Sequence, residues 1–309
     1  MQSIIQNQKK PQAIEAGLAF RQAYDYSKNY KAILWVTTFV LATVQLAIPL
    51  MGKYGFDAEV LKNLEMLPVI FLALYVLCSS FGKAKMKYWH DKGCKIQNLH
   101  DYLALGVGTR IKDFEIFPSE IKRLYKIRVN SHPTDAADFA NWWDGNLDKV
   151  SFQEARITCA YSTFSWEVEL RKNYQTFLQG IFFLVIAAIL IASYYYQSSI
   201  KEILLFAIVP FIPFISLVLE EIFDNKSCIN VADSIRTDSC NVWYNVHDNK
   251  LNDVEINEKV EDLMNRWRIY RLTTLPIFEW LYKITQKRMN MEMVTNTSAL
   301  VEQLKARNN

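Results

Sequence analysis

Four long runs without a single charged residue or histidine limit what this chain can fold into. The runs are 20, 17, 20 and 17 residues long and cover Ala32–Met51, Met66–Gly82, Phe177–Tyr196 and Ile203–Leu219. About 17–25 apolar residues in a helix, at about 1.5 Å each, cross a hydrocarbon core of about 30 Å. The two 17-residue runs could instead be core helices of a soluble domain. We expect them to cross the membrane, with flanking residues such as Leu61–Leu64 or Ile222–Phe223 extending the spans. The sequence therefore predicts an all-α integral membrane protein with four transmembrane helices, arranged as hairpins at 32–82 and 177–219.

Basic residues mark the cytoplasmic side of these four spans. The two segments that share one side, 52–65 and 197–202, contain only three of the 35 Lys and Arg residues. Lys and Arg resist translocation, so the side that holds the other 32 is the cytoplasm. Both termini are then cytoplasmic, and so are the segments 1–31, 83–176 and 220–309. Because little of the chain faces outward, we expect it to respond to something in the cytosol or the membrane.

Helical patterns dominate the polar segments as well. Apolar residues recur every three or four positions after the second span, and this stalk should end at Gly106 and Gly108. Ser151 with Glu154, and Asn252 with Glu255, have the spacing of capping boxes that open helices. The segment 225–250 shows no clear period and is predicted to be irregular, with a short strand at 242–246. The cytoplasmic domain built from 83–176 and 220–309 is therefore predicted to be mainly helical, with Pro276 ending one helix before a last one.

The sequence lacks the common catalytic motifs. It contains no H-E-x-x-H, G-x-S-x-G, Walker loop or G-x-G-x-x-G pattern. Its five cysteines form no C-x-x-C pair. His90 and His100 lie near Cys94 and Asp101 on one predicted helix, where helix packing is favoured over a metal site. We expect no enzyme, no bound metal and no cofactor.

Polar residues inside the spans are the candidates for lining a pore. None of them is ionisable, which argues against an ion pump or a proton-coupled transporter. Hydrogen bonds between helices explain these residues as well as pore lining does, and packing is the favoured interpretation. Four narrow helices cannot enclose a water-filled lumen, so a pore would need several protomers. The pore-lining candidates are Thr38, Gln45, Gln179, Ser193 and Ser216.

Aromatic and basic residues on the predicted inner side form a candidate ligand site. Aromatic faces stack on nucleobases, and guanidinium groups pair with phosphate. The alternative is that the tryptophans are core residues and that the arginines face solvent or lipid headgroups, and composition alone favours this alternative. The candidates are Trp142, Trp143, Arg156, Trp166 and Arg171.

Motifs along nearly the whole chain resemble one known family. They are Arg21-Gln22-Ala23-Tyr24, Lys95-Ile96-Gln97 with Asp101-Tyr102, Asn141-Trp142-Trp143, Ala155-Arg156 with Cys159, Trp166 with Leu170-Arg171, and Tyr270-Arg271 with Pro276 and Trp280-Leu281-Tyr282. In type, order and placement around the spans they are similar to those of the SMODS-associated four-transmembrane effectors. Those proteins belong to bacterial anti-phage systems that signal with cyclic oligonucleotides (CBASS). The chain departs from the family pattern at His100, at Ala160-Tyr161 and at Glu279, and Tyr161 replaces an arginine whose phosphate-binding role cannot be carried over.

The resemblance implies a function for the inner domain and the spans. A cyclic di- or trinucleotide, rather than a nucleic acid polymer, would bind the cytoplasmic domain. The spans of several copies would then form an ion-conducting pore in the bacterial inner membrane and stop the infected cell. Arg156, Trp166 and Arg171 are the residues expected to contact or couple the nucleotide. The alternative is a membrane-anchored scaffold whose inner helices bind a cytosolic protein partner.

Overall fold

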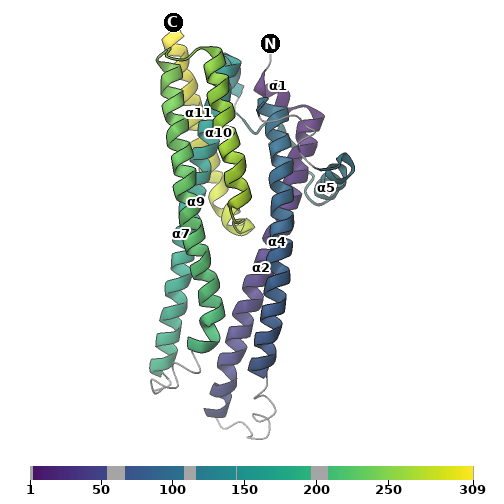
Figure 1. Cartoon of the computed structure of the whole chain (residues 1–309), viewed down its shortest axis with the longest axis vertical. Coiled ribbons are helices and arrows are strands. Elements are labelled where there is room, and N and C mark those ends of the chain that lie inside the picture. Colours follow the sequence, from purple (N-terminus) through teal and green to yellow (C-terminus); the bar gives the residue numbers. More distant parts are fainter. Residues whose placement is uncertain (1–2, 54–66, 108–115, 144, 196–207, 309) are drawn as a thin grey trace. The chain divides into compact units, whose positions relative to one another are not determined.

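The computed structural model contains nine α-helices and one 3₁₀ helix in the residues that it describes, which are 3–53, 67–107, 116–143, 145–195 and 208–308. No strand occurs in these ranges, which confirms the all-α class. Figure 1 traces the helices, which are α1 (Ile4–Gln8), α2 (Pro11–Lys53), α4 (Leu67–Leu105), α5 (Pro118–Ser131), α6 (Asp135–Ala140), η2 (Gly145–Lys149), α7 (Phe152–Tyr195), α9 (Val209–His247), α10 (Asp253–Thr273) and α11 (Glu279–Asn308).

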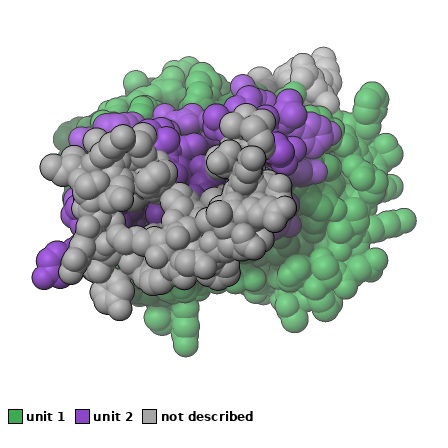
Figure 2. Space-filling view, turned by 90° about the horizontal axis from the view of Figure 1, so that it is seen from below, with its two compact units in different colours: residues 1–27, 88–172, 227–309 green, residues 28–87, 173–226 purple. Residues whose placement is uncertain are grey.

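The chain divides into two compact units, coloured separately in Figure 2. Unit 1 comprises Met1–Ser27, Tyr88–Lys172 and Ser227–Asn309, and unit 2 comprises Lys28–Lys87 and Asn173–Lys226. The four longest helices, α2, α4, α7 and α9, each contribute residues to both units. Unit 2 holds the predicted spans, and unit 1 holds most of the polar chain.

Local sequence signals set most of the helix ends. The backbone N–H of Ser151 donates to Glu154 at 2.8 Å, and the N–H of Glu154 donates to the Ser151 hydroxyl at 3.2 Å, so this predicted capping box is confirmed. The capping box of Asn252 and Glu255 at the start of α10 is confirmed as well. Helix α4 ends where Gly106 takes a φ of +67°, a left-handed conformation that suits glycine.

The prediction of irregular chain at 225–250, with a strand at 242–246, is wrong. Helix α9 continues through this segment to His247. Its Asn, Asp and Ser residues have low helix propensity, but one face of the helix repeats at intervals of three and four and is buried. Burying that face in unit 1 outweighs the weak local preference. The buried face consists of Cys228, Ala232, Ile235, Ser239, Trp243 and Val246.

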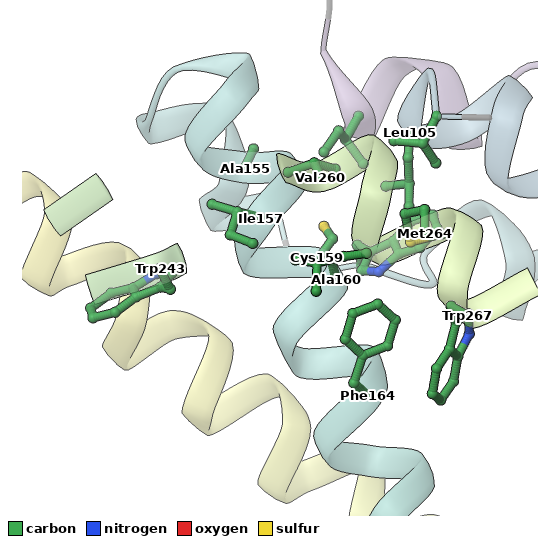
Figure 3. Packing of buried hydrophobic residues seen from close by; sticks show 14 of the residues in the cluster. Leu105, Ala155, Ile157, Cys159, Ala160, Phe164, Trp243, Val260, Met264 and Trp267 are labelled. Carbon is green, nitrogen blue, oxygen red and sulfur yellow. The ribbon is translucent and has the colours of Figure 1, made fainter. Parts of the chain in front are cut away.

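The core of unit 1 joins residues that are far apart in the sequence. Cys159 and Phe164 of α7 pack with Met264 and Trp267 of α10, as Figure 3 shows. The rings of Phe164 and Trp267 have centroids 4.5 Å apart. A second cluster of unit 1 packs residues of α2 and α4 around Phe139. Burying such side chains contributes about 1.5–3 kcal/mol each.

The surface of unit 2 is apolar, in contrast to an ordinary soluble fold. Eight of its large aliphatic or aromatic side chains are between 61% and 69% exposed, namely Ile33, Val36, Leu77, Phe81, Phe183, Leu184, Ile191 and Phe223. Among the described residues, two helices are long and apolar enough to cross a membrane, over Pro11–Ala47 and Phe152–Ile191. Only 28% and 22% of their most apolar stretches are buried. A core helix of a soluble protein would be mostly buried, so this surface is one that a lipid bilayer would cover.

The described helices contain nearly all of two predicted spans and only part of the other two. The runs 32–51 and 177–196 lie in α2 and, as far as Tyr195, in α7. The other two runs begin outside the described residues, at Met66 and at 203–207, and their remaining parts open α4 and α9.

A buried ion pair joins α4 to α10 inside unit 1. The guanidinium of Arg271 donates to the carboxylate of Asp101, and both side chains are 9% exposed. The Cys94 thiol donates to the backbone oxygen of Arg271 at 3.4 Å. Burial alone would raise the pKa of Asp101, but Arg271 holds this pKa below its ordinary value.

Replacing Asp101 with Asn should destabilise the protein by about 3–5 kcal/mol, because it leaves the Arg271 charge buried without its partner. Thermal unfolding of the full chain in detergent measures this. Asp238→Asn, which breaks the half-exposed pair between Asp238 and Arg266, is the matched control and should cost about 0–1 kcal/mol. The Asp101 contribution is present above its unfolded-state pKa of about 3.9 and is lost as the pH falls through the lowered folded-state pKa. The difference in unfolding free energy between wild type and Asp101→Asn should therefore shrink below about pH 4. Equal destabilisation by Asp101→Asn and Asp238→Asn would contradict the role of the buried pair.

Candidate ligand site

One cavity of unit 1 lies between α7 and α11. We call it the α7–α11 groove; its volume is about 500 Å³. Pockets for small molecules usually measure about 300–1,000 Å³. The side chains that line it come from both helices and are Tyr161, Ser162, Ser165, Trp166, Glu169, Met289, Glu292, Met293, Asn296, Ala299, Leu300 and Gln303.

Trp166 is the aromatic residue that sequence analysis selected and that lies in the groove. Its ring packs edge-on against Tyr282, with centroids 5.7 Å apart. Its indole Nε1 is buried and has no hydrogen-bond partner among the described residues. Met289 and Met293 add a flexible, polarisable wall. The groove therefore offers a flat planar ligand an aromatic side chain and apolar contacts.

Two carboxylates give the groove its charge. Glu169 and Glu292 both line it, and the lining contains no Lys or Arg. Arg288 lies beside them, with its guanidinium nitrogens 3.9 Å from a Glu169 oxygen and 3.5 Å from a Glu292 oxygen. Burial and a hydrogen bond to Cys240 raise the pKa of Tyr161 to about 12, so its hydroxyl stays protonated at neutral pH. The groove favours ligand groups that donate hydrogen bonds.

Arg156 lies elsewhere in unit 1 and joins three helices. Its guanidinium donates to Glu261 at 2.8 Å, to the backbone oxygen of Gly106 at 3.2 Å and to the side-chain oxygen of Asn257. The residue is 5% exposed. Burial lowers its pKa, and the nearby Glu261 offsets this only in part. Arg156 thus holds α7 against α10 and the end of α4.

Arg171 is also buried and bound to protein groups. It donates to Glu167 at 2.9 Å and to the backbone oxygen of Leu275 at 3.1 Å. The Tyr270 hydroxyl donates to the same Glu167 oxygen at 3.1 Å. Burial would lower the pKa of Arg171, but Tyr270 and Glu167 raise it above its ordinary value. The position links α7 to the segment after α10 that contains Pro276.

Trp142 and Trp143 line a second, much smaller cavity of about 40 Å³. Trp143 stacks on His100 with centroids 6.0 Å apart, and its backbone N–H donates to Gln8 at 2.9 Å. Trp142 stacks on Phe139 at 5.4 Å. The structure thus brings Trp166 into the α7–α11 groove, while Trp142, Trp143, Arg156 and Arg171 occupy other parts of unit 1.

The candidates for pore lining differ in exposure. The Thr38 hydroxyl donates to the Leu34 oxygen and the Ser193 hydroxyl to the Ile189 oxygen, each at 2.7 Å within its own helix. Both side chains are buried, Gln45 is half-buried, and Gln179 and Ser216 are exposed. Their pore-lining role stays a prediction.

Sequence reasoning missed a charged cluster in unit 2. Lys31 of α2 forms an ion pair with Glu221 of α9. It also donates to the Tyr174 hydroxyl of α7 at 2.8 Å, and that hydroxyl donates to Glu221 at 2.6 Å. The exposed fractions are 1% for Lys31, 1% for Tyr174 and 4% for Glu221. We call these three residues the Lys31–Tyr174–Glu221 cluster; the signal in the sequence was that each stands within three residues of an apolar run.

Comparison with known families gave one match, which covers nearly the whole chain. The family model described as the SMODS-associating 4TM effector domain matches residues 2–300. The chain belongs to this family. Comparisons with curated proteins and with solved structures found no match.

Family membership confirms the resemblance drawn from the motifs and fits four membrane spans. The chain is therefore a membrane effector linked to SMODS signalling. Within the described residues, no group of three or more His, Cys, Asp or Glu side chains has the geometry to hold a metal ion.

The contacts of Arg156 predict a structural role that is visible without any nucleotide. Replacing Arg156 with Ala should lower stability by about 3–5 kcal/mol, because Glu261 and the Gly106 oxygen lose their donor. Arg156→Lys should restore little, since one ammonium cannot reproduce the planar fork. The melting temperature of the ligand-free protein measures both.

The matched control is Arg288→Ala, which removes a half-exposed arginine. It should change stability by about 0–1 kcal/mol. If Arg156→Ala left the melting temperature unchanged and abolished only nucleotide binding, Arg156 would be a ligand contact and not a structural bridge.

Proposed function

We propose that this protein is an anti-phage effector of the bacterial inner membrane, a homo-oligomeric pore that a cyclic di- or trinucleotide opens. The residues 83–176 and 220–309, together with both termini, would face the cytosol and bind the nucleotide. The spans of several copies would line the conducting path. The effector carries out no catalysis in this proposal and needs no cofactor.

The observation that carries the proposal is the buried Lys31–Tyr174–Glu221 cluster inside a unit with an apolar surface. Ionisable groups at membrane depth or at its edge are costly and usually functional. The cluster joins α2, α7 and α9, which contain three of the four predicted spans. An ion pair without a functional role is replaceable by apolar residues at little cost. We interpret the cluster as a latch that holds the inner ends of three spans together in the closed state.

A closed resting state is required because a leaking pore would kill the uninfected cell. Shifting a protein from about 1:99 to 99:1 in favour of the open state takes about 10⁴-fold tighter binding to that state. The helices offer a covalent path for this coupling, because Trp166 of the α7–α11 groove and Tyr174 of the latch belong to the same helix, α7.

Ion flux from liposomes that contain the purified full chain tests the proposal. The probes are cyclic di-AMP, cyclic di-GMP, cyclic GMP–AMP and cyclic tri-AMP. The wild-type protein should give no ion flux without nucleotide and should conduct ions with at least one of these probes. A membrane-anchored scaffold would conduct with none of them, and that result would reject the pore.

Replacing Lys31 with Met should produce flux without any nucleotide, because Glu221 and Tyr174 lose the cation that joins them to α2. The matched control is Lys83→Met, which breaks the exposed pair between Lys83 and the neighbouring Glu220. Side-chain exposures of 44% and 54% make that pair a weak one. Liposomes with Lys83→Met should show no more ion flux without nucleotide than the wild type. Equal flux from the Lys31→Met and Lys83→Met variants would contradict the latch.

A further inference from the structure

The α7–α11 groove has the donor and acceptor pattern of a site for one particular nucleobase. Its lining combines a tryptophan face, two carboxylates and two side-chain amides, and it contains no basic residue. Carboxylates only accept hydrogen bonds and repel phosphate. A nucleotide bound here must therefore place its base inside and its phosphates outside.

Guanine is the standard base whose donor edge matches the two carboxylates. Its N1–H and N2–H₂ groups are adjacent donors, whereas adenine and cytosine present one exocyclic amine beside an acceptor nitrogen. A carboxylate therefore accepts two parallel hydrogen bonds from guanine and one from adenine or cytosine. Glu169 and Glu292 are half-exposed at the groove, where such an edge can reach them. The amides of Asn296 and Gln303 supply donors for the guanine O6.

Stacking and charge complete the fit. The Trp166 side chain lines the groove, and nucleobases of any kind stack on aromatic rings. Arg288 lies within 3.9 Å of Glu169 and 3.5 Å of Glu292 but outside the lining. It is the cation that a phosphate at the mouth of the groove would meet. The volume of about 500 Å³ suits one base with its ribose.

We propose that the α7–α11 groove binds the guanine base of a guanine-containing cyclic oligonucleotide, with Glu169 and Glu292 as the residues that select guanine. This inference rests on the proposed function and names its ligand class and its site. The base is held by Trp166 and the carboxylates, and the phosphates face Arg288.

Equilibrium binding of cyclic di-GMP and cyclic di-AMP to the detergent-solubilised full chain tests the selection. A good bidentate pair discriminates by about 1–3 kcal/mol, which corresponds to a roughly 5- to 150-fold preference for cyclic di-GMP. Glu169→Gln and Glu292→Gln each replace an acceptor oxygen by a donor; because one carboxylate takes the whole N1–H/N2–H₂ edge, the variant with both changes should weaken cyclic di-GMP binding at least roughly 5-fold. The ligand-free melting temperature of each variant establishes that it is folded.

The matched control is Glu302→Gln, an exposed glutamate of the same helix α11 that does not line the groove. It should bind cyclic di-GMP like the wild type. Equal affinity for the two nucleotides, or groove variants that bind like Glu302→Gln, would overturn the guanine site while leaving the nucleotide-gated pore intact. Failure of every probe, cyclic tri-AMP and cyclic GMP–AMP included, would overturn both.

Discussion

The ion pair between Lys31 and Glu221, bridged by the Tyr174 hydroxyl, is the interaction on which this account of the molecule depends. The three side chains are buried in a unit whose outer surface is apolar. Charges in such surroundings are tolerated only when they are paired and hydrogen-bonded, and losing one partner costs about 3–5 kcal/mol. Because the partners come from α2, α7 and α9, the same energy that keeps the charges buried also holds these helices together.

Buried arginines hold helices together in unit 1 in a comparable way. Their protein contacts distinguish them from the residues that line the α7–α11 groove. Arg156, Arg171 and Arg271 each hold two or more protein acceptors and lie at interfaces between helices. The α7–α11 groove contains no arginine in its lining and presents carboxylates and a tryptophan instead. Phosphate recognition by a buried arginine is thus not the arrangement that the geometry of this unit favours. Recognition of a base, with the phosphates at the rim, is the alternative that the groove supports.

The sequence was sufficient for the fold class and for the helix ends, because these depend on local signals. Uncharged runs, two capping boxes and Gly106 each act within a few residues of the helix that they shape. It was insufficient at α9, because this segment contains residues of low helix propensity. The segment is helical because one of its faces is buried in unit 1, and that burial depends on tertiary packing. It was also insufficient for the site, because Trp166 and Met293 are more than a hundred positions apart in the sequence and share a groove only through the pairing of α7 with α11. Lys31 and Glu221 each lie next to an apolar run in the sequence. Their ion pair could not be predicted, because it depends on which spans pack against each other.

Exchanging the two charges tests the latch most directly, because it changes the residues but keeps the pairing. Ion flux without nucleotide is measured in liposomes that contain Lys31→Glu, Glu221→Lys or the double variant. Each single variant places two like charges together and should leak, whereas the double variant restores an opposite-charge pair and should be as tight as the wild type. Tight single variants, or a double variant that leaks as much as they do, would contradict the account.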